Sequence, residues 1–165
     1  MGRSRTNNRL VGARLTRNMK SAWIISSASI DKPWGEETSW NSQGAVTVKT
    51  MTLKKGQRNS FKYHDLKNEL LICATGSVKA YFADEELIKN DIGDLKTAIL
   101  KEKMALSVQS GCPYRLEALE DSIILEVSSA ARGQESANRI HDDYGRKTIK
   151  VSKHIEDIVK RWFLS

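Results

Sequence analysis

The chain has 165 residues, of which 39% are hydrophobic and 28% are charged, as expected for one soluble globular domain. No apolar run approaches the roughly 20 residues that a membrane-spanning helix needs, so we predict no membrane association. The two cysteines, Cys73 and Cys112, form neither a disulfide framework nor a C-x-x-C metal motif.

The net charge of +7 is concentrated at the N-terminus. Residues 1–20 contain six of the 27 basic residues and no acidic residue, so the rest of the chain has 21 basic and 20 acidic residues. Nucleic-acid binding needs a basic face that neutralises phosphates. We therefore do not expect the body of the protein to bind nucleic acid.

Residues 1–30 contain no acidic residue, and three interpretations of this segment stay open. It is an organelle targeting peptide, a disordered basic arm, or an upstream extension before a start at Met19. No continuous apolar stretch follows the basic residues, so it is not a secretory signal. We predict a disordered or dispensable leader on a cytoplasmic protein, with organelle targeting as the alternative.

Beyond the leader, short segments rich in β-branched residues alternate with turn residues, which is typical of strands. Pro33 and Gly35 flank Trp34 and mark the entry into the ordered part. A series of short strands without an intervening helix predicts an antiparallel sandwich or barrel. The predicted strands are Val46–Leu53, two within 56–76, Ser77–Phe82, one near 86–89, 97–100, 104–108, Tyr114–Ala118 and 122–127, before a linker at 130–138.

The stretch 56–76 is predicted to be two strands joined by a tight turn. Side chains in a strand repeat every two residues, so Arg58, Ser60, Lys62 and His64 are expected on one face. His64 and Glu69 lie across the turn and can converge on one point. Such a pair is either a ligand or metal site or a satisfied polar pair, and the local spacing alone favours the polar pair.

The C-terminal segment 148–165 contains a predicted amphipathic helix. Ser152 can cap its start, and acidic residues precede basic ones along it, which suits the helix dipole. Its apolar residues follow helical spacing, and we expect them to cover the barrel rather than to form a dimer interface. They are Ile155, Ile158, Val159, Trp162 and Phe163.

Several motifs occur together in a recognisable order. They are Lys32-Pro33-Trp34-Gly35, the G-x-R-x-S-x-x-Tyr-His run at 56–64, Glu69, Gly76, the turn at 111–115, and Asp142-Asp143-Tyr144-Gly145-Arg146. In this order they resemble the cupin superfamily and, within it, the small cupins related to type II mannose-6-phosphate isomerase. The resemblance covers about residues 31–147 and implies an all-β cupin double-stranded β-helix, or jelly-roll barrel, with the C-terminal helix added.

The resemblance also implies a divalent metal, such as zinc or manganese, held by histidines and a glutamate inside the barrel. His64 and Glu69 occupy two of the four usual ligand positions. The other two fall at Leu66, which cannot coordinate a cation, and at Tyr114, an uncommon ligand with a pKa near 10. The metal site is therefore predicted to be degenerate, and a metal-free barrel is the alternative.

The isomerase resemblance implies proton transfer between adjacent sugar carbons, which needs a base and an electrophile. His64 or Glu69 is the candidate base, and Lys62 can polarise an oxygen in place of a metal. The alternative for Lys62 is a structural ion pair with Glu69. Substrate contacts are expected from four further residues, Arg58, Ser60, Tyr114 and Arg146, although the segment 142–146 is more consistent with a structural turn.

The motifs and the resemblance together support two functions. The first is a mannose-6-phosphate isomerase-like protein that acts on or binds a sugar phosphate or sugar nucleotide in carbohydrate and polysaccharide metabolism. The second is a non-catalytic cupin that binds a small molecule and has lost its metal site. Either protein has a small-molecule partner, and a homodimer is compatible with both. The sequence does not identify the substrate.

Overall fold

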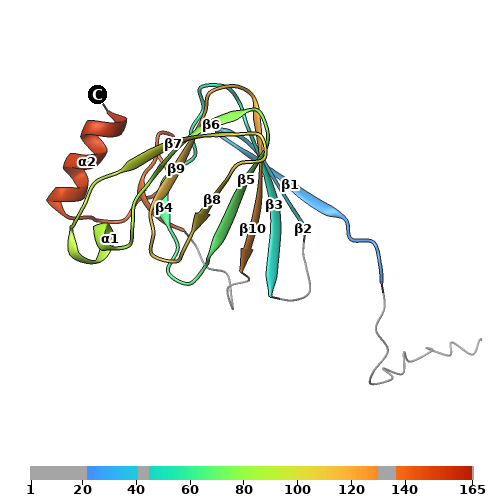
Figure 1. Cartoon of the computed structure of the whole chain (residues 1–165), viewed down its shortest axis with the longest axis horizontal. Coiled ribbons are helices and arrows are strands. Elements are labelled where there is room, and N and C mark those ends of the chain that lie inside the picture. Colours follow the sequence, from blue (N-terminus) through green and yellow to red (C-terminus); the bar gives the residue numbers. More distant parts are fainter. Residues whose placement is uncertain (1–21, 41–44, 130–136, 165) are drawn as a thin grey trace, which may run out of the picture.

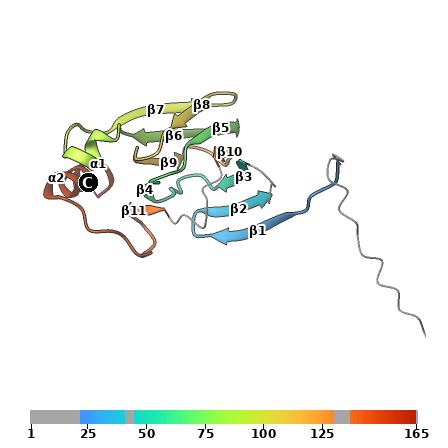
Figure 2. The ribbon, with the colours of Figure 1, turned by 90° about the horizontal axis from the view of Figure 1, so that it is seen from below.

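Two antiparallel sheets face each other and enclose the core (Figures 1 and 2). The computed structural model describes residues 22–40, 45–129 and 137–164. Sheet A has the order β1-β2-β3-β10-β5-β8, and sheet B has the order β11-β4-β9-β6-β7. The strands are β1 (Ser27–Lys32), β2 (Gly35–Trp40), β3 (Val46–Leu53), β4 (Phe61–Tyr63), β5 (Glu69–Thr75), β6 (Ser77–Phe82), β7 (Lys96–Lys101), β8 (Ala105–Val108), β9 (Tyr114–Ala118), β10 (Ser122–Ser129) and β11 (Asn138–His141).

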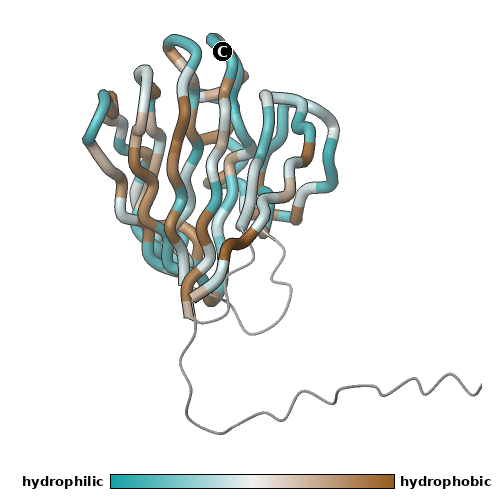
Figure 3. Tube along the Cα trace, turned by 90° about the vertical axis from the view of Figure 1, so that its right-hand side faces the viewer, coloured by the Kyte–Doolittle hydropathy of each residue, from teal (hydrophilic) through white to brown (hydrophobic). Residues whose placement is uncertain are grey.

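Alternation along the strands decides which side chains face the interior. On β10, Ser122, Ile124, Glu126 and Ser128 are buried, whereas the residues between them are more exposed. Hydrophobic stretches run along the strands in Figure 3, separated by hydrophilic ones. The interior between the sheets is therefore mainly apolar, but it also contains a few charged groups.

The two helices lie at the end of the molecule away from β1 and β2 (Figure 1). In α2 (Lys153–Phe163), the Ser152 hydroxyl accepts a hydrogen bond from the Ile155 amide at 3.3 Å. This cap satisfies one of the free amides of the first turn. Ile155, Ile158 and Phe163 pack into a second apolar cluster with residues of sheet B. The helix thus covers its own barrel, as predicted.

The close approach of two strands requires a glycine at position 35. Gly35 has a φ of +145°, and a Cβ there would lie 1.8 Å from the backbone oxygen of Thr52. Trp34, beside it, is 4% exposed and joins the main core cluster. The Pro33-Trp34-Gly35 segment therefore forms and anchors the turn between β1 and β2.

The fold class predicted from the sequence is confirmed, with local differences. The segment 86–89 is not a strand but lies in α1 (Glu86–Asn90), where an ion pair between Lys89 and Glu85 stabilises the turn. The strands β1, β2 and β11 were not predicted, and β1 includes the last four residues of the predicted leader. Residues 1–21, and the predicted linker from 130 to 136, lie outside the described residues.

No helix in the described part of the chain is long and apolar enough to cross a membrane.

Candidate functional site

A partly exposed lysine, Lys67 in the turn before β5, joins two buried carboxylates inside the barrel. Lys67 Nζ lies 2.6 Å from Glu69 Oε1 and 2.8 Å from Glu126 Oε1. Glu69 on β5 and Glu126 on β10 are 3% and 2% exposed, respectively. Ser128 donates a further hydrogen bond to Glu126 Oε1 at 3.2 Å. One ammonium group therefore forms ion pairs with two carboxylates that come from different strands of sheet A.

His64 lies beside this ion-paired group. Its Nε2 atom is 3.7 Å from Glu69 Oε1, so the predicted convergence of His64 and Glu69 is confirmed. Neither ring nitrogen has a hydrogen-bond partner among the described residues. Burial, together with the positive charges of Lys62 and Lys67, lowers the pKa of His64 to about 3. The imidazole is therefore neutral at pH 7.

The Lys67 charge controls the ionisation of Glu126. Burial opposes ionisation of Glu126, but the ion pair with Lys67 and the charge of Lys62 together lower its pKa to about 2. Burial likewise acts against the ammonium of Lys67, and the charges of Glu126 and Glu69 raise the Lys67 pKa in spite of it. Both partners thus carry their charges at neutral pH.

Lys62 on β4 also points into the barrel, but no carboxylate of the described residues lies within ion-pairing distance of it. Its Nζ atom lies 5.5 Å from the centroid of the Tyr114 ring. Burial lowers the pKa of Lys62, against the effect of Glu69 and Glu126. The alternative of an ion pair between Lys62 and Glu69 does not form, because Lys67 is the lysine that pairs with Glu69.

Lys62 lines a cavity of about 60 Å³ between the two sheets. Four of the lining residues are cationic and one is acidic, and that acid, Glu37, forms an ion pair with Lys49 at 3.3 Å. These charges give the cavity a positive electrostatic potential. Its lining residues are Lys32, Trp34, Glu37, Met51, Asn59, Ser60, Lys62, Arg139 and Arg146.

Arg146 lines the cavity but is held by the turn that carries it. Its Nη2 atom lies 2.6 Å from Asp142 Oδ1 and donates to Ser60 Oγ at 2.8 Å. Burial raises the pKa of Asp142, but hydrogen bonds from Arg146, Ser60 and the Tyr144 amide hold it well below its usual range. Ser60 and Arg146 thus lie together at the cavity, and the segment 142–146 forms the structural turn that the sequence favoured.

Arg58 is not among the lining residues of the cavity, contrary to the expected common face with Lys62. It forms an ion pair with Asp143 at 2.8 Å and lies over the Phe163 ring of α2, 5.9 Å from its centroid. Arg115, which is 0% exposed, binds the same Asp143 oxygen at 2.8 Å. Regular alternation fails at Arg58 because β4 begins only at residue 61.

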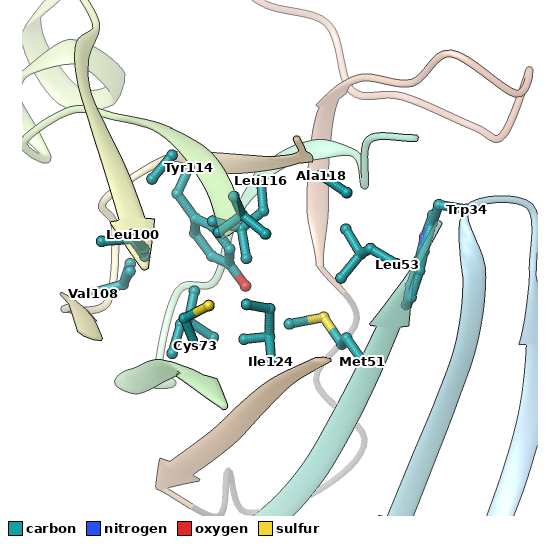
Figure 4. Close-up of a cluster of buried hydrophobic side chains, with 13 residues drawn as sticks. Trp34, Met51, Leu53, Cys73, Leu100, Val108, Tyr114, Leu116, Ala118 and Ile124 are labelled. Atoms are coloured by element: carbon teal, nitrogen blue, oxygen red, sulfur yellow. The ribbon is translucent and has the colours of Figure 1, made fainter. Parts of the chain in front are cut away.

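Tyr114 and Leu66 occupy very different environments. Tyr114 is 0% exposed and lies in the main core cluster with Cys73, Leu116 and Ile124 (Figure 4). Burial and the nearby charge of Glu69 raise its pKa well above 10, so the phenol stays protonated. Leu66 is 72% exposed in the turn before β5. Neither residue supplies a metal ligand at neutral pH.

The residues present do not fit the metal that the family resemblance implies. The described residues contain no group of three His, Cys, Asp or Glu side chains placed to hold a metal ion. The Lys67 ammonium already lies between the two carboxylates, and a metal ion there would meet a like charge. His64 and Glu69 therefore remain together, but as neighbours of a lysine.

Lys67 and Glu126 are the central residues that were not predicted, although the sequence carries signals for both. Lys67 precedes Glu69 by two residues, so the two side chains share a face wherever the backbone is extended. Glu126 is the only charged residue of β10 and falls on the same alternate positions as the buried Ile124. A lone charge on the inward face of an apolar strand indicates a buried partner.

Several solved structures have a similar architecture. The chain superposes on KdgF from a Halomonas species with a TM-score of 0.53 and 14% identity, over 64% of this chain and 87% of that chain. A cupin from Shewanella frigidimarina described as RmlC-like superposes with a TM-score of 0.52 and 11% identity, over 64% of this chain and 86% of that chain. The chain has the cupin fold.

A second kind of cupin-fold match is to part of a longer protein. Oxalate decarboxylase from Bacillus subtilis, in which Mn(II) centres have been studied, matches with a TM-score of 0.59 and 16% identity, over 71% of this chain but only 32% of that chain. No family model and no curated protein matches this chain. At these identities the likeness extends to the fold alone, so the isomerase resemblance stays a prediction.

Proposed function

We propose that this cupin binds a small anionic compound in the basic cavity and needs no metal ion to do so. The observation that carries the proposal is the lining of the cavity, where Lys32, Lys62 and Arg139 have no carboxylate of the described residues within ion-pairing distance. Arginine binds carboxylates and phosphates through paired hydrogen bonds, and lysine adds a point charge.

The size of the cavity limits the part of the ligand that enters it. About 10–15 Å³ of such volume holds one water molecule, so 60 Å³ has room for only a few non-hydrogen atoms. The carboxylate of a small acid, or the phosphate of a larger compound such as a sugar phosphate, fits this limit. The remainder of a larger ligand lies outside the cavity.

Calorimetric titration of the protein, after treatment with a chelator, tests this proposal. We expect pyruvate, inorganic phosphate or mannose 6-phosphate to bind without added metal. Arg139→Gln should weaken that binding by about tenfold, since a charge-assisted hydrogen bond contributes roughly 1.5–3 kcal/mol. Lys101→Gln, an exposed residue of β7, is the matched control and should bind as the wild type does. The proposal fails if no anion binds, or if binding appears only with a divalent cation.

Aldose–ketose isomerisation of a sugar phosphate is the second candidate, because a neutral His64 and Lys62 lie near the anion-binding cavity. We rank it second because a general base works best with a pKa near the operating pH, whereas the pKa values of His64 and Glu126 lie far below 7. Turnover of mannose 6-phosphate that Lys62→Met abolishes would favour the isomerase. Absence of turnover, with and without divalent cations, would contradict it.

A further inference from the structure

Lys62 differs from the other two lysines of the barrel interior. Lys49 forms an ion pair with Glu37, and Lys67 forms ion pairs with both central glutamates. Lys62 has no such partner in the described part of the chain, and its ammonium group lies 5.5 Å from the centroid of the Tyr114 ring. Its amine is therefore not held in place by an ion pair with a described residue.

The same amine is accessible to a ligand. Lys62 lines the basic cavity, whereas Lys67 and Lys49 are not among its lining residues. In the register of sheet B, Lys62 lies directly opposite Arg139 on β11 and, on its other side, opposite Tyr114 on β9. Side chains at directly paired positions lie about 5 Å apart at Cβ, so an anion held by Arg139 lies beside the Lys62 amine.

We infer that Lys62 is a carbonyl-binding residue, which forms an imine with a small 2-oxo acid or aldehyde acid whose carboxylate is held by Arg139 and Lys32. This inference rests on the proposed anion-binding function and extends it by naming the ligand class. In a 2-oxo acid the carbonyl carbon is bonded directly to the carboxylate, so binding the carboxylate at Arg139 presents the carbonyl to the amine. A three-carbon acid is also small enough for the cavity.

The step is balanced without a further reactant. The neutral amine of Lys62 attacks the carbonyl carbon, a C–N bond forms, and the carbonyl oxygen takes up a proton. The carbinolamine then loses this oxygen as water and leaves a protonated imine on the lysine. The protonated imine keeps the single positive charge of a lysine, and the Tyr114 ring can stabilise it as a cation.

Reductive trapping tests the inference directly. The wild-type protein is incubated with pyruvate and sodium borohydride at neutral pH, and its intact mass and peptide map are measured. Hydride addition to the imine leaves a stable secondary amine on the modified lysine. We expect one adduct per chain, on Lys62, with about tenfold or more label there than on any exposed lysine, because a carboxylate held at Arg139 places the carbonyl beside the Lys62 amine. Lactate, which has the carboxylate but no carbonyl, should give no adduct.

Two variants sharpen the result. Lys62→Met should lose the adduct, and Lys101→Met should keep it. Peptide mapping of the wild-type protein decides the matter even if the Lys62 variant does not fold. Binding of pyruvate by calorimetry without any adduct would overturn the imine and leave the anion-binding function intact. Adducts spread evenly over exposed lysines would also overturn it, and absence of both adduct and binding would overturn both proposals.

Discussion

At the centre of the barrel, Lys67 supplies the positive charge that two buried carboxylates require. Isolated buried charges are costly, and removal of one partner from a buried ion pair typically costs about 3–5 kcal/mol. Glu69 and Glu126 each lie within 2.8 Å of the same ammonium group. The charges therefore depend on one another, and the arrangement tolerates a change at Lys67 only if another cation replaces it.

The neutral, buried His64 makes stability depend on pH. Its pKa is about 3 in the folded chain and 6.5 when exposed, so below pH 6.5 the unfolded chain takes up a proton that the folded chain does not. The free energy of unfolding should therefore fall as pH drops from 6.5 towards 3, by at most about 1.4 kcal/mol per pH unit. Urea denaturation across this pH range measures the slope.

His64→Gln should flatten the dependence of the free energy of unfolding on pH, which would identify His64 as the group responsible. Burial also lowers the pKa of His141, although Asp143 opposes the shift, so His141→Gln is the comparison variant. If the slope between pH 6.5 and 5 is the same in His64→Gln as in the wild type, His64 is not the group responsible.

At the scale of elements, α2 covers one side of sheet B and protects a buried arginine. Phe163 is 6% exposed, packs against Phe61 at a ring-centroid distance of 5.3 Å, and lies 4.6 Å below the guanidinium of Arg115. Arg115 in turn binds Asp143 and the backbone oxygen of Asn59. The helix thus stabilises the strand β9, which carries Arg115 and Tyr114.

Phe163→Ala should lower the free energy of unfolding by about 3 kcal/mol or more, because it removes a buried aromatic ring and uncovers Arg115. Leu164→Ala, which changes a residue that is 62% exposed, is the matched control and should stay within about 0.5 kcal/mol of wild type. Chemical denaturation of the three proteins measures both values. Equal stabilities would show that α2 does not support the barrel.

The regular strands could be predicted from the sequence because their signals are local. β3, β6 and β9 have the predicted bounds, since turn residues flank each of them and β3 is also a run of β-branched residues. The strands β1, β2 and β11 could not be predicted this way, because SASIDK, GEETSW and NRIH carry no such pattern and depend on strand pairing in the folded sheets.

The site was predicted only in part, for a related reason. His64 and Glu69 were found together because a single turn joins them, and their distance of 3.7 Å follows from local geometry. The partner Glu126 lies 57 residues further along the chain, on a strand that meets β5 only in the folded sheet. Local alternation likewise misplaced Arg58, whose position is set by Asp143 and α2.

For the whole molecule, the charges between the sheets form two sets. In one, Lys67 is shared by Glu69 and Glu126, and in the other, the cavity presents cations that lack carboxylate partners among the described residues. The proposed function uses the second set to attract an anion without a metal ion to hold it. Binding should weaken as ionic strength rises, because screening reduces the attraction.

The metal content of the purified protein tests most directly whether this barrel works without a metal ion. We expect wild-type protein incubated with manganese or zinc and then desalted to contain no stoichiometric metal, because the described residues hold no group of three ligands placed for a metal ion and the Lys67 ammonium lies between the two buried carboxylates. One metal ion per chain in the wild-type protein would contradict a barrel in which lysine replaces the metal.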